Sequence, residues 1–201
     1  GYRSSDVTNL MADGTQILLD PVRMGPIQRI ESYSGTLYVL RPGELVLFDG
    51  LTVDEYVIDW GALPSPRTRD MLAPDARLLV TTDKGVAVLR GAAMTVLDRA
   101  DRIPYEDTTC LARGFDGDVW LGTTKGAIRM LEDDWHYFGA DHWLPGDYVR
   151  AIAVDGKNVY IATDHGIGII RYELYTLRKK ADYYERWLDE WGHKRLGFVH
   201  L

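Results

Sequence analysis

The stretch that decides the fold is Gly117-Asp118-Val119-Trp120-Leu121-Gly122-Thr123-Thr124-Lys125-Gly126-Ala127-Ile128. Laid over the rest of the chain on Gly126, it finds three partners, because glycines at 43, 85 and 166 also stand between two apolar segments. The glycines at 85, 126 and 166 have two further features in common. Six positions before each stands a large apolar residue, namely Leu79, Trp120 and Tyr160. Three positions before each stands a threonine, namely Thr82, Thr123 and Thr163. The chain is therefore predicted to consist of four repeats of about 40 residues.

Each repeat has the pattern of a small antiparallel meander. A strand and a turn precede the glycine unit, as with Asp116-Gly117 and Asp155-Gly156, and Asp-Gly between strands is a strong hairpin signal. The recurrent threonine is expected to hydrogen-bond the nearby turn, and the glycine to supply a positive φ. Four short strands in about 40 residues are typical of a β-propeller blade. We predict an all-β propeller of four blade-like repeats, approximately 25–60, 68–99, 108–139 and 149–171.

The third repeat resembles a known family. Trp120-Leu121-Gly122-Thr123 followed by Gly126, with Asp116-Gly117-Asp118-Val119 before it, is similar to the two-component regulator propeller repeat. The run Leu144-Pro145-Gly146-Asp147-Tyr148-Val149 resembles that family's connection between blades. The resemblance covers residues 25–171. It implies a bacterial, extracytoplasmic setting, because such repeats occur in sensor halves of membrane kinases and in secreted carbohydrate-processing proteins. The repeat itself reports the fold and not the ligand.

The fourth repeat departs from the pattern, because no fourth strand follows Ile170. Apolar residues three or four apart instead predict an amphipathic helix, with its stripe at Leu174, Leu177, Ala181, Tyr184, Leu188 and Trp191. We expect a propeller over 1–172, and a C-terminal helix and tail over 173–201 that could link to a further domain. Trp187 and Trp191 are expected to pack against the propeller or against that domain.

How the ring closes is left open by the sequence. A strand predicted at 15–20 could supply the missing fourth strand of the last blade. The ring could also be larger, completed by further sequence or by a second chain. The segment 181–199 is in addition similar to the one that joins such propellers to a helical toroid of polysaccharide-lyase type.

Composition narrows the function classes. A formal charge of −7 over 201 residues disfavours nucleic-acid binding. The sequence contains no run of eighteen apolar residues, so this segment is not expected to insert into a membrane. Cys110 is the single cysteine, so no internal disulfide and no cysteine-based metal site are expected, and it is interpreted as a small buried hydrophobe. Asp116-Gly117-Asp118 is interpreted as a turn and not as a calcium loop. No metal or cofactor is predicted.

Two groups of residues are candidates for ligand binding. The inner hairpin tips should gather at one mouth of the ring, and each brings a potential cation: Arg41, Lys84, Lys125 and His165, with Asp164 beside the last. Such a collar would suit an acidic oligosaccharide or polysaccharide containing uronic acid. The alternative is that solvated turn residues were simply copied with the repeat. The second group is Asp141-His142-Trp143, in the connection to the last blade, where an aromatic ring could stack on a sugar.

No nucleophile or nucleotide-binding motif is present, so catalytic residues are not assigned. The leading hypothesis is a non-catalytic ligand-binding or docking module of a larger extracytoplasmic protein. One alternative is the front part of a polysaccharide lyase, a carbon–oxygen lyase acting on a uronic-acid glycan. Another is a structural scaffold that positions neighbouring domains. Besides the glycan, the expected partner is a further domain or a second chain packed on the C-terminal helix.

Overall fold

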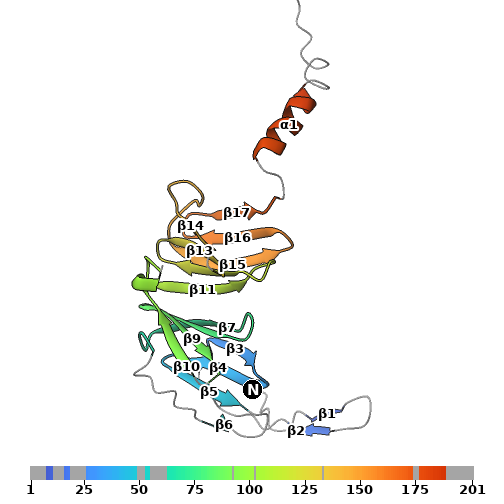
Figure 1. Ribbon diagram of the computed structural model, residues 1–201. Helices are drawn as coiled ribbons and strands as arrows, with labels where there is room; N and C mark the ends of the chain where they lie inside the picture. The colour runs from blue at the N-terminus through green and yellow to red at the C-terminus, as the bar shows by residue number, and fades with distance from the viewer. Residues whose placement is uncertain are drawn as a thin grey trace, which may run out of the picture.

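The computed structural model describes residues 8–10, 16–18, 26–48, 53–54, 63–91, 93–101, 103–132, 134–173 and 177–188. In this part of the chain, four antiparallel sheets follow one another, and we call them blades 1 to 4 (Figure 1). Blade 1 comprises β3 (Arg29–Tyr33), β4 (Thr36–Arg41), β5 (Glu44–Phe48) and β6 (Val53–Asp54). Blade 2 comprises β7 (Thr68–Leu72), β8 (Leu78–Thr82), β9 (Gly85–Arg90) and β10 (Ala93–Leu97).

Blade 3 comprises β11 (Thr108–Arg113), β12 (Val119–Thr123), β13 (Gly126–Leu131) and β14 (Asp134–Phe138). Blade 4 comprises β15 (Val149–Asp155), β16 (Asn158–Thr163) and β17 (Ile167–Arg171). A short 3-10 helix, η2 (Arg99–Asp101), lies between blades 2 and 3, and a hairpin of β1 (Thr8–Leu10) and β2 (Gln16–Leu18) precedes blade 1. Strands adjacent in sequence are adjacent in each sheet, which is the meander of a propeller blade. The predicted all-β propeller of four blade-like repeats is confirmed.

The recurrent threonine and glycine close the hairpin between the second and third strand of a blade. Thr123 lies opposite Gly126, and its hydroxyl donates to the Gly126 carbonyl (2.7 Å) and accepts the Lys125 N–H (3.0 Å). Thr82 and Thr163 make the same two bonds in their own blades. Gly126 has a φ of 117°, which disfavours any residue with a side chain. The predicted roles of both residues are confirmed.

The first repeat is shifted by one residue from the alignment that the sequence suggests. Arg41 lies opposite Glu44, so that Pro42 and Gly43 form the turn and Glu44 occupies the position of Gly85 in blade 2. The reason is local: proline followed by glycine with a positive φ (74° for Gly43) is the preferred centre of a type II turn. Gly43 is therefore a turn residue and not the equivalent of Gly85, and the prediction was wrong at this point.

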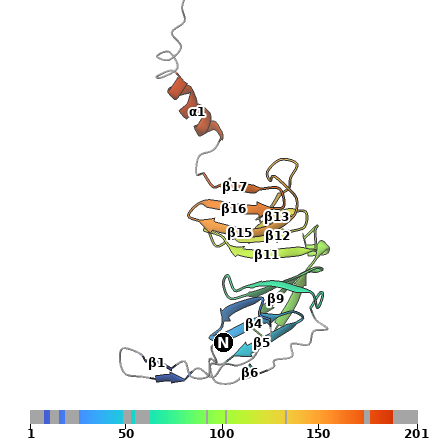
Figure 2. The same ribbon diagram turned by 180° about the vertical axis from the view of Figure 1, so that it is seen from behind.

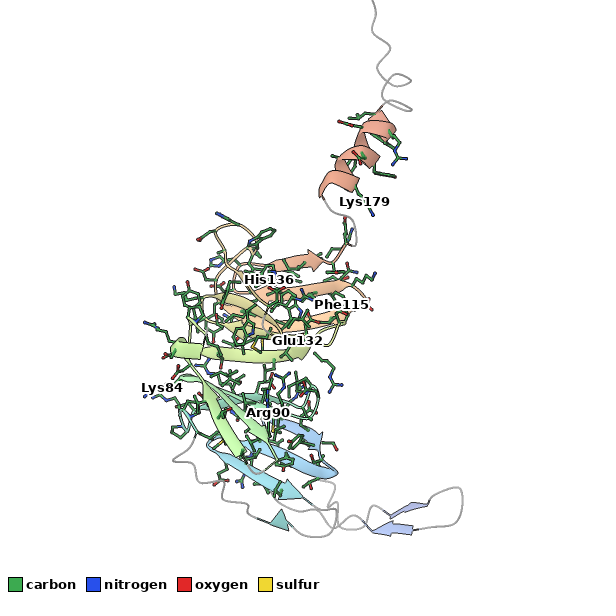
Figure 3. All side chains as sticks on the ribbon, viewed as in Figure 1. Lys84, Arg90, Phe115, Glu132, His136 and Lys179 are labelled. Atoms are coloured by element: carbon green, nitrogen blue, oxygen red, sulfur yellow. The ribbon has the colours of Figure 1, made fainter. Side chains whose placement is uncertain are left out.

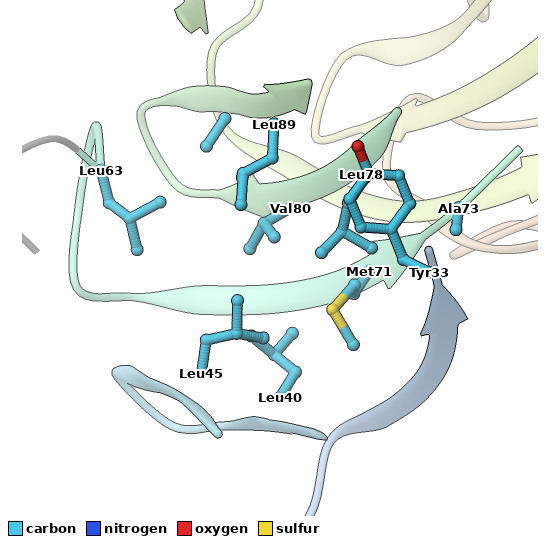
Figure 4. Close-up of a cluster of buried hydrophobic side chains, with 10 residues drawn as sticks. Tyr33, Leu40, Leu45, Leu63, Met71, Ala73, Leu78, Val80 and Leu89 are labelled. Carbon is cyan, nitrogen blue, oxygen red and sulfur yellow. The ribbon is translucent and has the colours of Figure 1, made fainter. Parts of the chain in front are cut away.

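The core lies between the blades. Leu40 and Leu45 of blade 1 face Met71, Leu78 and Val80 of blade 2 (Figure 4). Corresponding clusters join blade 2 to blade 3, with Leu79 and Leu121 among them, and blade 3 to blade 4, with Trp120 and Ile161. The first strands of successive blades, β3, β7, β11 and β15, lie against one another. A sheet that is apolar on both faces is stable only when a neighbour covers each face, which is why the blades stack.

The four blades form an open arc. Blades 1 and 4 lie at opposite ends of the stack in both views (Figures 1 and 2). The strand at Gln16–Leu18, suggested as a closing strand, pairs with Thr8–Leu10, and blade 4 has three strands within the described residues. The described part of the suggested closing strand, Gln16–Leu18, is therefore paired in a separate hairpin and not with the last blade.

Helix α1 (Leu177–Trp187) follows blade 4 and extends away from the sheets (Figure 1). Its side chains at Lys179 and from Ala181 onward are exposed, and Trp187 is 49% exposed. The expected packing of Trp187 on the propeller is not observed, while Trp191 and Leu174 lie outside the described residues. Among the described helices, none is long and apolar enough to cross a membrane.

Candidate functional site

The hairpin tips of blades 2, 3 and 4 lie along one edge of the arc, which we call the tip edge. The connection between blades 2 and 3 bridges two of them, because the Glu106 carbonyl accepts the Gly85 N–H (2.7 Å) and the Asp107 carbonyl accepts the Thr124 N–H (3.0 Å). The next connection repeats the arrangement with Asp147 and Tyr148, which accept from Gly126 (2.7 Å) and Asp164 (3.1 Å). Figure 3 shows Lys84 at this edge and Phe115, in a β11–β12 turn, away from it.

The tip edge carries acids as well as the predicted cations. The Arg41 guanidinium pairs with Glu44 at 2.9 Å, and the His165 imidazole Nδ1 lies 3.0 Å from the Asp164 carboxylate. Two arginines that the sequence analysis did not single out also pair here, Arg67 with Asp83 (3.3 Å) and Arg69 with Asp107 (2.6 Å). The edge is therefore a surface of mixed charge and not a uniformly basic collar.

Lys84 and Lys125 differ from the other cations. No ion pair is found for either ammonium group among the described residues, and both side chains are exposed. Each occupies the second position of its two-residue turn, where the threonine hydroxyl fixes the backbone N–H. An exposed ammonium group that makes no ion pair within the described residues is available to bind an anion.

A depression of about 420 Å³ opens between the tips of blades 3 and 4. It brings together three of the predicted residues, Lys125, Asp164 and His165, with a tyrosine and the connection between the two blades. The residues that line it are Thr124, Lys125, Ala140, Pro145, Gly146, Asp147, Tyr148, Asp164 and His165. A Cβ atom on Gly146 would lie 2.4 Å from the Asp164 carboxylate and 2.7 Å from the His165 ring, so a larger residue there would displace these two exposed side chains. The chain backbone thus lies directly under the acid–imidazole pair.

The Asp164 carboxyl ionises more readily than an ordinary aspartate side chain, because its pKa is lowered. Desolvation opposes ionisation of Asp164, but the hydrogen bond from His165 and its positive charge outweigh it and lower the pKa of the Asp164 carboxyl. Asp164 is therefore a carboxylate at neutral pH, able to accept hydrogen bonds from hydroxyl groups.

The other predicted residues lie outside this depression. Asp141, His142 and Trp143 are exposed in the turn after β14, where the Trp143 and Leu144 N–H groups both donate to the Gly139 carbonyl (3.1 Å). Trp143 is 60% exposed, and its ring is T-shaped to the Phe138 ring, with the two ring centroids 6.0 Å apart. Ala140 and Pro145, on either side of this turn, do line the depression. Arg41 and Lys84 belong to the tips of blades 1 and 2.

A second polar group is buried inside blade 3. The Asp118 carboxylate is fully buried and accepts hydrogen bonds from the Arg129 guanidinium (2.6 Å) and the Trp120 indole (2.9 Å). Burial opposes its ionisation, yet the Arg129 and Asp116 donors lower its pKa below the ordinary value. These contacts hold the Trp120 ring against the Phe138 ring, with the ring centroids 5.2 Å apart, so Trp120 has a structural role. No cluster of potential metal ligands is found among the described residues.

Comparison with known proteins places the chain at the level of fold. No family model matches it, and no curated protein matches it. Among solved structures, it is similar to the extracellular domain of the putative one component system BT4673 from B. thetaiotaomicron, with a TM-score of 0.60 and 17% identity over 75% of this chain and 22% of that one. It is also similar to a catalytically inactive virginiamycin B lyase from Staphylococcus aureus with quinupristin, with a TM-score of 0.59 and 13% identity over 82% of this chain and 58% of that one.

These likenesses confirm the propeller fold that the repeats predict. The chain therefore has the β-propeller fold that these structures share with it. It spans about a fifth of that domain and somewhat more than half of the lyase. At this identity the likeness carries the fold and not the ligand.

Proposed function

We propose that the chain is a non-catalytic ligand-binding module of a larger extracytoplasmic protein, and that it binds an acidic glycan at the tip edge. The observation that supports this proposal is the depression between blades 3 and 4, where Lys125, the Tyr148 ring and the Asp164–His165 pair line one space; in the described part of the chain no ion pair is found for Lys125. The extracytoplasmic setting is supported by the similarity to an extracellular domain.

The lining suits one residue of a uronic-acid glycan. The Lys125 ammonium would pair with the sugar carboxylate, and the Tyr148 ring, 37% exposed, offers a face for the apolar side of the sugar. The Asp164 carboxylate and the His165 ring would exchange hydrogen bonds with hydroxyl groups. The volume of about 420 Å³ is within the usual range for small-molecule sites. Lys84, at the neighbouring tip, would bind the carboxylate of a further sugar residue.

The test is calorimetric titration with an oligogalacturonate, with its methyl-esterified neutral form as a control ligand. We expect the acidic form alone to bind, and Lys84→Glu with Lys125→Glu to abolish binding, since each charge-assisted contact contributes about 1.5–3 kcal/mol, or roughly tenfold to a hundredfold in affinity. Lys157→Glu is the matched control, because this exposed lysine lies in the β15–β16 turn and not at the tip edge. Equal affinity of the double variant and the wild-type protein would refute the proposal.

The same incubations test the lyase alternative. A lyase would convert the uronate into an unsaturated sugar, which is detected by its ultraviolet absorbance. Binding without a rise in absorbance supports the module, and a rise supports the lyase. If neither is observed, the scaffold hypothesis is preferred. The segment 181–199, on which the similarity to lyases was based, is only described as far as 188.

A further inference from the structure

The junction between blades 3 and 4 contains a second pocket, at the end of the blades opposite the tip edge. Its volume is about 150 Å³. An apolar cavity of about this volume holds one benzene molecule. The rings of Phe115, Trp120, Phe138 and Tyr172 line it, and we call it the aromatic pocket. Figure 3 labels Phe115 in the part of the molecule that blades 3 and 4 form.

The aromatic walls are held in place by contacts within the chain. The Trp120 and Phe138 rings stack, with an interplanar angle of 30°. The Phe115 and Tyr172 rings form a second pair, tilted by 53° with their centroids 5.2 Å apart. The Tyr172 N–H donates to the Lys157 carbonyl (2.9 Å), which fixes the backbone after β17. The pocket is therefore formed before any ligand enters, which lowers the cost of binding.

Arg129 is the residue that distinguishes this pocket from the rest of the repeat. The register of each blade gives its counterparts in blades 1, 2 and 4, which are Leu47, Val88 and Ile169. All three counterparts are apolar, so blade 3 alone among the four blades carries a charge at this position. In blade 2, Val88 is buried in the apolar cluster that joins that blade to blade 3. The repeat therefore does not need an arginine here in order to fold.

The polar groups of the pocket are mainly hydrogen-bond donors. The Arg129 side chain is 12% exposed, and its Nε donates to Asp118 (2.6 Å), but no hydrogen bond from its two terminal nitrogens is found in the described part of the chain. His136, opposite Arg129 in register, and Arg171, whose Nε donates to the Asn158 side chain (3.1 Å), also line the pocket. None of the described lining residues is acidic. The matching ligand group is an acceptor, of which a carboxylate is the strongest.

We propose that the aromatic pocket binds a small aromatic carboxylate, meaning a single ring with a short acidic side arm. The ring would pack against the aromatic walls, and the carboxylate would accept hydrogen bonds from the terminal nitrogens of Arg129. A neutral aromatic group would fill the same space but leave these mostly buried donors without an acceptor. A sugar would bring hydroxyl donors that find few acceptors here. The pocket is separate from the tip edge, so the proposal does not depend on the glycan.

The test is calorimetric titration of the full chain with phenylacetate, and with phenylacetamide as its neutral counterpart of the same shape. We expect saturable binding at one site, with phenylacetate at least about tenfold tighter than the amide, because hydrogen bonds between two charged groups are the stronger ones. Galacturonate, a sugar acid, should not displace phenylacetate. The inference is overturned if phenylacetate shows no saturable binding, if the amide binds equally well, or if galacturonate competes.

Two substitutions locate the binding site. Arg129→Gln should weaken phenylacetate binding at least about tenfold, since the charged donor is lost. Ile170→Trp, at a half-buried position that lines the pocket, adds a ring to the space and should abolish binding while leaving Arg129 in place. Arg90→Gln is the matched control, because this exposed arginine ends β9 of blade 2 and is the counterpart of Arg171. Circular dichroism verifies that each variant is folded. A folded Ile170→Trp protein with wild-type affinity would overturn the inference.

Discussion

The substitution Gly126→Ala tests whether the hairpin glycine holds the blade together. Gly126 has a φ of 117°, and a Cβ atom there would lie 2.2 Å from the Phe138 carbonyl oxygen of the neighbouring strand. That oxygen is backbone and belongs to the β13–β14 ladder, where Ala127 lies opposite Phe138. A residue with a side chain at positive φ costs about 1–2 kcal/mol, and separating the ladder strands adds about 2 more. We expect a total destabilisation of about 3–4 kcal/mol.

Thermal unfolding followed by circular dichroism measures this effect. For a chain of this length each kcal/mol lowers Tm by about 2–4 °C, so Gly126→Ala should lower it by about 6–16 °C. Gly117→Ala is the matched control, because Gly117 has a φ of 76° but a Cβ atom there would meet nothing within 4 Å. Its Tm should fall by only about 2–8 °C, from backbone strain alone. If both variants unfold at the same temperature, the contact with Phe138 is not what requires glycine.

Two further predictions concern buried groups. Asp118→Ala leaves the Arg129 and Trp120 donors without their buried acceptor and should destabilise by about 3–5 kcal/mol in urea unfolding. Folding lowers the pKa of Asp118 from 3.8, so the stability that its carboxylate contributes is complete above pH 3.8 and is lost as the pH falls through the folded-state pKa. The difference in unfolding free energy between the wild-type protein and Asp118→Asn should therefore become smaller in acid. A difference that does not change with pH would contradict this prediction. Burial raises the pKa of the Cys110 thiol to about 11. At pH 8 a thiol reagent should therefore label the folded protein at least about a hundredfold more slowly than the urea-unfolded chain. Rapid labelling of the folded protein would contradict the burial of this thiol.

The fold was predictable where the deciding interactions are local. The two-residue turn, the threonine that bonds it and the glycine after it all lie within four residues. The conformation around Thr123 and Gly126 is therefore determined by the local sequence. The same reasoning failed for the first repeat, because glycine serves two purposes in hairpins. Gly43 supplies the positive φ inside a Pro-Gly turn, whereas Gly126 follows a turn. The residue type alone does not distinguish these positions, but the proline before Gly43 was a usable signal.

The candidate site was predictable only in part, because its partners come from different blades. The tip residues Lys125, Asp164 and His165 were found from their place in the repeat, and the structure brings them together. Tyr148 was quoted only as part of a blade connection, and its role depends on how that connection crosses two tips. The Asp107 partner of Arg69 comes from the connection to the next blade, and the Asp83 partner of Arg67 comes from the next hairpin of the same blade, so neither pair is encoded by a local pattern. The hypothesis of a basic collar counted the cations of the turns without these acids.

The location of the depression has a structural explanation in the first strand of each blade. The Thr68 hydroxyl of blade 2 donates to the Arg41 carbonyl of blade 1 (2.9 Å), and the Thr108 hydroxyl of blade 3 donates to the Thr82 carbonyl of blade 2 (2.6 Å). The equivalent position in blade 4 is Val149, which has no hydroxyl and is buried in the apolar cluster instead. The tips of blades 3 and 4 are therefore not tied by this side-chain bond, and it is between these two tips that the space lined by Lys125 and His165 opens.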